Sequence, residues 1–200
     1  MHNSIQDRQE RFLALFEPLQ PRLRQFVLVM TRNEELAKDI IGETILIAFE
    51  RLDSVRNEQA FLSFLFTIAT RVYREWSRKH KSMVAISEER MAALLAPTTP
   101  PDIAADIAAM YRALDLLPEK QREAVILFEV LGFSMKEIRE IQGGTGVSVR
   151  VRIARGRKKL AQLLGVEDIS PPPLEITGHA SSDTPMERNA VHFYSVRVGP

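Results

Sequence analysis

The sequence contains no cysteine, and this absence excludes both a disulfide framework and a thiolate metal site. Its four histidines, His2, His80, His179 and His192, are scattered along the chain without the spacing of metal ligands. The stretch Gly143–Gly146 lacks the lysine and the length of a phosphate-binding loop. We also find no nucleophile paired with a base. We therefore expect a protein that is not an enzyme and that needs no cofactor and no metal.

Long hydrophobic runs are missing as well. No stretch approaches the roughly 18 uninterrupted apolar residues of a membrane span. The segment up to Phe12 has no apolar core of a signal peptide. The apolar fraction of 45% and the charged fraction of 26% are those of an ordinary soluble protein. We therefore expect a cytoplasmic protein without membrane insertion.

An excess of one charge sign is also absent, because the formal net charge is only +1. The distribution of charge is uneven, however. The segment Ser148–Leu160 reads SVRVRIARGRKKL and holds six basic residues and no acidic one. Val149, Ile153, Gly156 and Leu160 fall at helical spacing on one side of it. This pattern is typical either of a solvated helix face or of a helix that binds DNA, and we favour DNA.

Apolar residues recur at spacings of three and four throughout, which predicts an all-α fold. Helices are expected over residues 10–30, with a break near Pro18 and Pro21, over 36–52 and over 60–79. Prolines and threonines between residues 97 and 101 indicate a linker. The stretch from Ser170 onward is rich in proline and serine, which indicates disorder. The predicted organisation is two small helical domains, 8–80 and 103–166, a flexible linker over 81–102 and a mostly disordered tail over 167–200.

The second domain carries the signature of a helix-turn-helix. Ser134 and Glu137 form a capping box at the start of a short helix. That helix ends at the break of Gly143 and Gly144, and Thr145 is placed to cap the basic helix. A short helix, a tight turn and a longer helix make the motif, whose second helix enters the major groove of DNA with its first residues toward the bases.

The outward side chains of the basic helix are the candidate DNA contacts. Arginines at its beginning suit guanine edges, whereas lysines one turn later suit phosphates as point charges. The candidates are Ser148, Arg150, Val151, Arg152, Arg155, Lys158 and Lys159.

Two further surfaces are expected in the first domain. On the 36–52 helix, Asp39, Glu43, Leu46 and Ile47 lie opposite the apolar stripe, which predicts a face that docks a partner. The alternative is that Leu46 and Ile47 pack under the N-terminal helix. Gly42 costs about 1 kcal/mol in a helix relative to alanine, so a close partner approach is one reason for its presence.

On the 60–79 helix, Arg71, Arg74 and Arg78 form a basic stripe. Tyr73 and Trp76 of this helix are expected in the core rather than as platforms for bases.

The chain resembles the ECF-type sigma factors, the small alternative sigma subunits of bacterial RNA polymerase. LPEKQREAVILFEVLGFSMKEI, followed by SVRVRIARGRKKL, is similar to their C-terminal domain. AKDIIGETILIAF is similar to their polymerase-binding helix, and FLSFLFTIATRVYREWSRK to the helix after it. Both motif sets stand in the family's order and cover residues 10–164.

The resemblance implies that the first domain binds core RNA polymerase and that both domains bind promoter DNA. Arg71, Arg74 and Arg78 would meet the minus-ten element, and Arg56 and Asn57 lie in the loop where the family captures a flipped base. The basic helix would read the minus-35 element. Regulation by an anti-sigma factor is a further implication of the family.

The chain departs from the family pattern at several positions, so it is identified as a divergent member. Lys38 and Gly42 replace a glutamate and a glutamine of the polymerase-binding helix. In the helix-turn-helix, Arg139, Gln142 and Gly144 stand where small or apolar residues are usual. Two alternatives therefore stay open: a sigma-like decoy that binds an anti-sigma factor, and a simple helix-turn-helix regulator.

Overall fold

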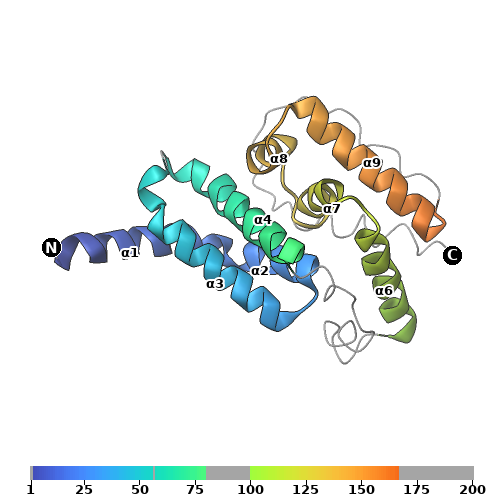
Figure 1. Cartoon of the computed structure of the whole chain (residues 1–200), viewed down its shortest axis with the longest axis horizontal. Helices are drawn as coiled ribbons and strands as arrows, with labels where there is room; N and C mark the ends of the chain where they lie inside the picture. Colours follow the sequence, from blue (N-terminus) through green and yellow to red (C-terminus); the bar gives the residue numbers. More distant parts are fainter. Residues whose placement is uncertain (1, 56, 80–99, 167–200) are drawn as a thin grey trace. The chain divides into compact units, whose positions relative to one another are not determined.

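The computed structural model describes residues 2–55, 57–79 and 100–166, with side chains from Ile5 onward (Figure 1). These residues form two compact units, one on each side of residues 80–99. The described residues contain helices and no strand, so the predicted all-α class is confirmed. None of the helices in these ranges has the length and apolar character needed to cross a membrane. The predicted tail and most of the predicted linker lie outside the described residues.

The N-terminal unit begins with a helix that starts earlier than the sequence predicts, at His2. Its elements are α1 His2–Phe16, η1 Glu17–Leu19, α2 Gln20–Thr31, α3 Glu34–Glu50, η2 Leu52–Ser54, η3 Glu58–Ala60 and α4 Phe61–Lys79. Pro18 and Pro21 interrupt the first helical region as predicted, because proline cannot donate the hydrogen bond that continues a helix. Because α1 begins at His2, the predicted start of the first domain at residue 8 falls within this helix.

The core of this unit is rich in phenylalanine. Helix α3 packs against α2 and α4, and α2 packs against α4. Phe12 of α1 stacks on Phe16 and meets Phe49 and Phe61 edge-on, with ring centroids 5.5–5.8 Å apart. Phe26 of α2 reaches the ring of Phe66 at 5.6 Å. Such ring pairs stabilise a core beyond the area that they bury.

Two capping interactions fix the ends of α3. Asn33 accepts a hydrogen bond from the Leu36 backbone N–H at 3.1 Å and starts the helix. At the other end, Arg8 of α1 donates to the carbonyl oxygens of Phe49 at 2.8 Å and Glu50 at 2.9 Å. A cation is favourable there because the last carbonyls of a helix carry partial negative charge.

Residues 100–166 of the C-terminal unit form four α-helices and one π-helical turn. Its elements are α6 Pro101–Asp115, α7 Glu119–Val125, the π-helical turn η5 Ile126–Val130, α8 Met135–Gln142 and α9 Gly146–Leu164. Helix α9 packs against α6, α7 and α8. Helix α6 starts two residues before the predicted start of the second domain at residue 103, because Pro101 occupies a first helical position that needs no N–H partner.

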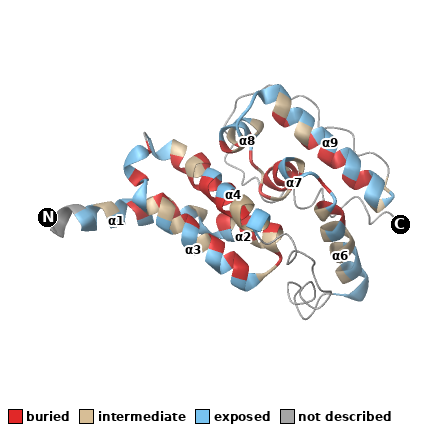
Figure 2. Ribbon diagram, in the orientation of Figure 1, coloured by how far each residue is buried: buried red, intermediate tan, exposed pale blue. Residues whose placement is uncertain are grey.

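Buried positions follow the inward faces of the helices, as Figure 2 shows for α4 and α9. Several buried residues are polar, so the spacing of apolar residues did not predict their burial. Thr44 is fully buried and donates its hydroxyl to the Ile40 carbonyl at 2.7 Å. Conversely, Trp76 of α4 was expected inside and is only half-buried, whereas Tyr73 is buried as predicted.

Candidate functional site

A tight turn positions the basic helix. Ser134 and Glu137 form the predicted capping box, in which the Ser134 N–H donates to the Glu137 carboxylate at 2.7 Å. After α8, Gly143 and Gly144 have φ of 71° and 98°, values that side chains other than glycine rarely adopt. Thr145 then caps α9, accepting from the Ser148 N–H at 3.1 Å. The helix-turn-helix of the sequence analysis is thus present.

Helix α9 turns its apolar side inward as predicted. Val149, Ile153, Gly156 and Leu160 are buried. Gly156 is required by close packing, because a Cβ at this position would lie 2.6 Å from Cγ2 of Val125 in α7. Helix α9 is therefore seated on α7 with little freedom to shift.

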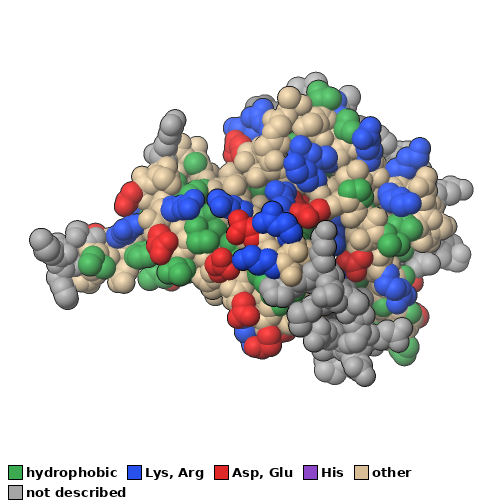
Figure 3. All heavy atoms as spheres, viewed as in Figure 1, with side chains coloured by type: hydrophobic (Ala, Val, Ile, Leu, Met, Phe, Trp, Pro, Cys, Tyr) green, Lys and Arg blue, Asp and Glu red, His purple; other side chains and the backbone are tan. Residues whose placement is uncertain are grey.

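Five of the seven candidate DNA contacts of α9 are exposed: Arg150, Val151, Arg155, Lys158 and Lys159. Basic side chains follow the outward side of this helix in Figure 3.

The other two candidates, Ser148 and Arg152, differ from the expectation. Both are half-buried. Ser148 takes part in the cap of α9, and its hydroxyl donates to the Thr145 carbonyl at 2.8 Å. Arg152 bends back toward the turn, where its Nη1 donates to the Gln142 side chain at 3.1 Å and to the Gly143 carbonyl at 3.2 Å.

Arg157 belongs to the basic run but does not lie on the outward face. It is buried, and its Nε lies 3.3 Å from Oε1 of Glu129 in the π-helical turn. The count of like charges in the sequence therefore included one that is neutralised by a neighbouring element. The helical spacing offered a signal, because Arg157 lies four residues after the inward Ile153.

The α3 face combines acidic and apolar side chains. Asp39, Gly42, Glu43 and Leu46 are exposed, and Leu46 keeps 58% of its accessible surface. Ile47 is half-buried, so the expectation of an outward apolar pair holds for Leu46 alone. A Cβ on Gly42 would meet no atom within 4 Å, which leaves this part of the surface open. Acidic side chains along α3 are visible in Figure 3.

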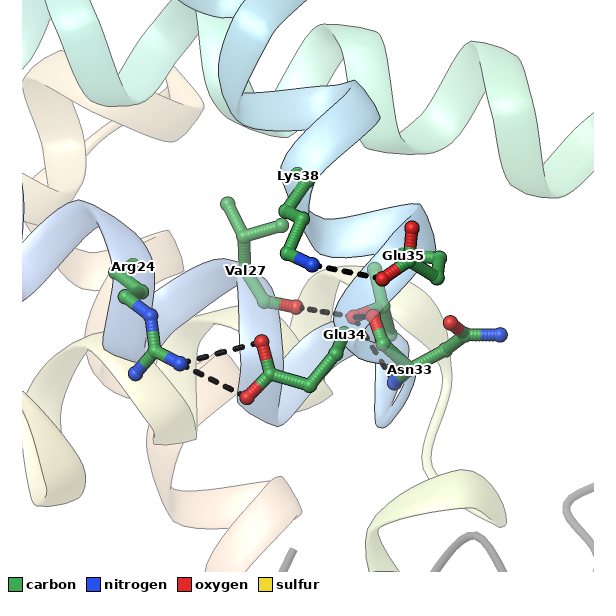
Figure 4. A network of polar contacts seen from close by, with 7 residues as sticks. Arg24, Val27, Asn33, Glu34, Glu35 and Lys38 are labelled. Atoms are coloured by element: carbon green, nitrogen blue, oxygen red, sulfur yellow. Dashed lines mark hydrogen bonds and ion pairs between the residues drawn. The ribbon is translucent and has the colours of Figure 1, made fainter. Parts of the chain in front are cut away.

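Polar contacts surround the first turns of α3 (Figure 4). Arg24 of α2 donates to both carboxylate oxygens of Glu34, at 2.8 and 3.2 Å. Lys38, one of the departures noted in the sequence, donates to Glu35 at 2.7 Å. This hydrogen bond and the charge of Glu35 raise the pKa of Lys38. The positive charge of Lys38 is thus paired with Glu35 within the helix. It therefore acts on Glu35 as well as on the neighbouring carboxylate of Asp39.

On α4 the arginine stripe is partly engaged. Arg71 pairs with Glu75 at 3.0 Å, and its hydrogen bond lowers the pKa of the Glu75 carboxyl. Arg74 is half-buried and Arg78 exposed. Asn57 accepts from the Ala60 N–H at 2.8 Å and starts η3, a role that sequence reasoning missed.

The last two site predictions concern Arg56 and a metal site. Arg56 lies outside the described residues. Within the described part of the chain, no three histidine or acidic side chains come together in a way that could hold a metal ion.

Two family descriptions match the chain. Residues 15–83 match "Sigma-70 region 2", and residues 107–160 match "Sigma-70, region 4". The first range spans α2 to α4, and the second contains the helix-turn-helix.

Curated relatives extend this match over both regions. The ECF RNA polymerase sigma factor EcfG of Rhodopseudomonas palustris is 32% identical over 154 residues, which cover 76% of this chain and 85% of that protein. The RNA polymerase sigma factor CarQ of Myxococcus xanthus is 32% identical over 158 residues, 78% of this chain and 91% of that protein.

Two solved structures are similar in fold. One is the sigma factor RpoE in complex with the anti-sigma factor NepR from Bartonella quintana, with a TM-score of 0.58 and 25% identity over 80% of this chain and 98% of that one. The other is CnrH in complex with the cytosolic domain of CnrY, with a TM-score of 0.61 and 24% identity over 78% and 89% of the two chains. The second likeness concerns the fold alone.

Proposed function

This chain belongs to the ECF family of RNA polymerase sigma factors, and we propose that α3 docks core polymerase while α4 and α9 contact promoter DNA. As a sigma factor it binds core RNA polymerase and directs transcription from specific promoters. Sigma factors are initiation factors and not enzymes. The proposal concerns which residues of this chain carry each contact.

The observation that carries the proposal is the geometry of α9. Its apolar side is buried, while Arg150 and Val151 in the second turn of the helix and Arg155 in the third are exposed. In a helix-turn-helix this end of the second helix faces the base edges. The later Lys158 and Lys159 are exposed and would neutralise phosphates of the minus-35 element.

The α3 face supports a second contact, with polymerase. Asp39 and Glu43 lie one turn apart, with exposed Leu46 beyond them. Exposed apolar surface flanked by acids suits a partner that is both apolar and basic, since the apolar contact gives affinity and the charges select the partner. The half-buried Ile47 would border this contact.

The minus-ten contacts are proposed on α4 and the loop before it. Arg71, Arg74 and Arg78 follow one another at three- and four-residue spacing along the helix. Asn57 and Arg56 belong to the preceding loop. The Arg71–Glu75 pair is exposed, so it would open at little cost when a phosphate replaces the carboxylate.

An anti-sigma factor is proposed as a further partner, because the similar sigma factor RpoE was solved in complex with one. A cytoplasmic location follows from the proposed partners, core polymerase and promoter DNA. The decoy alternative shares the anti-sigma partner but not the polymerase, so polymerase binding separates the two.

The test is co-purification with core RNA polymerase after reversal of both acids, Asp39→Lys together with Glu43→Lys. We expect polymerase binding to be lost while the helical circular-dichroism signal is kept, because both side chains are exposed. The matched control reverses Glu10 and Glu58, two exposed acids of the same unit, and should still bind.

Undiminished binding by the first double variant would overturn the assignment of the face. Failure of the wild-type chain itself to bind core polymerase would favour the decoy.

A further inference from the structure

Three helices of the C-terminal unit meet at the side chain of Gln142, the last residue of α8. Its Nε2 donates to the Lys120 carbonyl at 3.1 Å and to the Glu123 carboxylate at 3.0 Å, both on α7. Its Oε1 accepts from Arg152 of α9 at 3.1 Å. The amide thus uses both ends to join α7, α8 and α9.

Opposite charges lie at the two ends of the Gln142 amide. Glu123 is completely buried, so its carboxylate depends on hydrogen bonds that replace water. The Gln142 amide turns its N–H groups toward this anion and its oxygen toward the Arg152 guanidinium. Hydrogen bonds to charged groups are the stronger ones, and aligned bonds polarise one another. The amide dipole therefore links a buried negative charge to a half-buried positive one.

The glycines of the turn make room for this arrangement. Arg152 also donates to the Gly143 carbonyl at 3.2 Å. A Cβ on Gly144 would lie 2.7 Å from the Ser148 hydroxyl and 3.1 Å from Nη2 of Arg152. Gln142 and Gly144, two of the departures from the family pattern, thus belong to the same local structure as Arg152.

We propose that Arg152 is a positioning residue, held by Gln142 and Gly143, that fixes the first turn of α9 against α7 and α8. We call the Glu123–Gln142–Arg152 chain of hydrogen bonds the turn clasp. In this role Arg152 reads no base and neutralises no phosphate. Direct readout by the first turns of α9 then falls to Arg150, Val151 and Arg155. The DNA-related part of this inference rests on the proposed function of α9.

The first arm of the test needs no DNA. Hydrogen exchange of the backbone amides of Ser148 and Val149, which donate to Thr145, is compared in the full chain, in Gln142→Ala, in Arg152→Ala and in the double variant. We expect either single substitution to speed exchange roughly tenfold, because a charge-assisted hydrogen bond is lost. The effects in the double variant should be less than additive, because both substitutions remove the hydrogen bond between Gln142 and Arg152. Arg150→Ala is the matched control and should exchange like the wild type.

The second arm measures binding of the same full-length variants to duplexes that the wild-type chain selects from a random pool. We expect Gln142→Ala and Arg152→Ala to weaken binding alike, with an unchanged slope of log affinity against log salt. Loss of a phosphate contact would instead reduce that slope by about 0.9. Loss of a base contact would relax the preference at one base pair.

A reduced slope, or a relaxed base pair in Arg152→Ala alone, would overturn the proposal. Wild-type exchange rates in Arg152→Ala would do so as well. If the wild-type chain selects no duplex, the proposed function fails, while the exchange arm still decides whether the turn clasp exists.

Discussion

Arg157 of α9 and Glu129 of the π-helical turn form an ion pair in which each side chain keeps only 9% of its exposure, with Nε 3.3 Å from Oε1. Removing one partner of such a pair leaves the other charge in a poorly hydrated place. The pair therefore makes the middle of α9 dependent on the π-helical turn, although Arg157 belongs to the basic run.

The first prediction concerns this pair. Arg157→Ala should lower the free energy of unfolding by about 3–5 kcal/mol, because Glu129 would remain buried without its cation. The neighbouring Lys158→Ala should change it by less than about 0.5 kcal/mol, because Lys158 is exposed. Urea denaturation of both variants provides the measurement. Equal effects of the two substitutions would contradict the difference in burial.

The second prediction uses two glycines in helix interiors. Gly42→Ala should stabilise the chain by about 1 kcal/mol, because alanine favours helix and its Cβ would meet no atom within 4 Å. Gly156→Ala should destabilise it by about 1–2 kcal/mol, because the clash with Val125 outweighs the same gain. Thermal melting of both variants shows whether each substitution raises or lowers the stability of the chain. A gain at both positions would mean that α7 and α9 can move apart.

The fold was largely predictable because its signals are local. The prolines at 18 and 21, the Ser134 capping box and the glycines at 143 and 144 act within a few residues, and each marked a helix end in the sequence. The burial of Thr44 was not predictable from apolar spacing, since its hydroxyl is satisfied by its own helix. The half-exposure of Trp76 likewise depends on what packs beside α4 and not on its spacing.

The third prediction addresses DNA readout by α9. Replacing Arg150 or Arg155 with alanine should cost about 1–3 kcal/mol of binding and relax the preference at one base pair. Replacing Lys159 should weaken all duplexes alike and reduce the salt slope by about 0.9. Titrations of selected and scrambled duplexes at several salt concentrations check both statements. A DNA affinity that ignores salt would be incompatible with either role.

The fourth prediction concerns pH and the Arg71–Glu75 pair. The pKa of Glu75 is lowered in the fold, chiefly by the hydrogen bond from Arg71. The associated stabilisation is therefore complete above the pKa of the unfolded chain and is lost as pH falls through the lower value. Arg71→Gln should raise the pKa of Glu75 toward its ordinary value, as followed by NMR titration of the carboxyl.

Arg78→Gln is the matched comparison for this titration. Arg78 acts on Glu75 through its charge and contributes less than the Arg71 hydrogen bond. A larger rise in the pKa of Glu75 in this variant than in Arg71→Gln would reverse the assigned cause.

The sequence identified the candidate surfaces but not the use of each side chain. The outward positions of α3 and α9 followed from the apolar stripes, since a stripe on one side defines the other. Arg152 and Arg157 are each held by a side chain that lies across from them. Their partners, Gln142 and Glu129, come from other elements, and no spacing within α9 reveals contacts of that kind.

Arg8 makes the ends of two helices in the N-terminal unit depend on one another. Its guanidinium holds the last carbonyls of α3 and lies 5.1 Å from the centre of the Phe49 ring. If α1 detaches, these carbonyls lose their donor and the last turn of α3 can fray. Detachment of α1 and fraying of α3 should therefore form a single cooperative opening, a small unit of local unfolding at the end of α3.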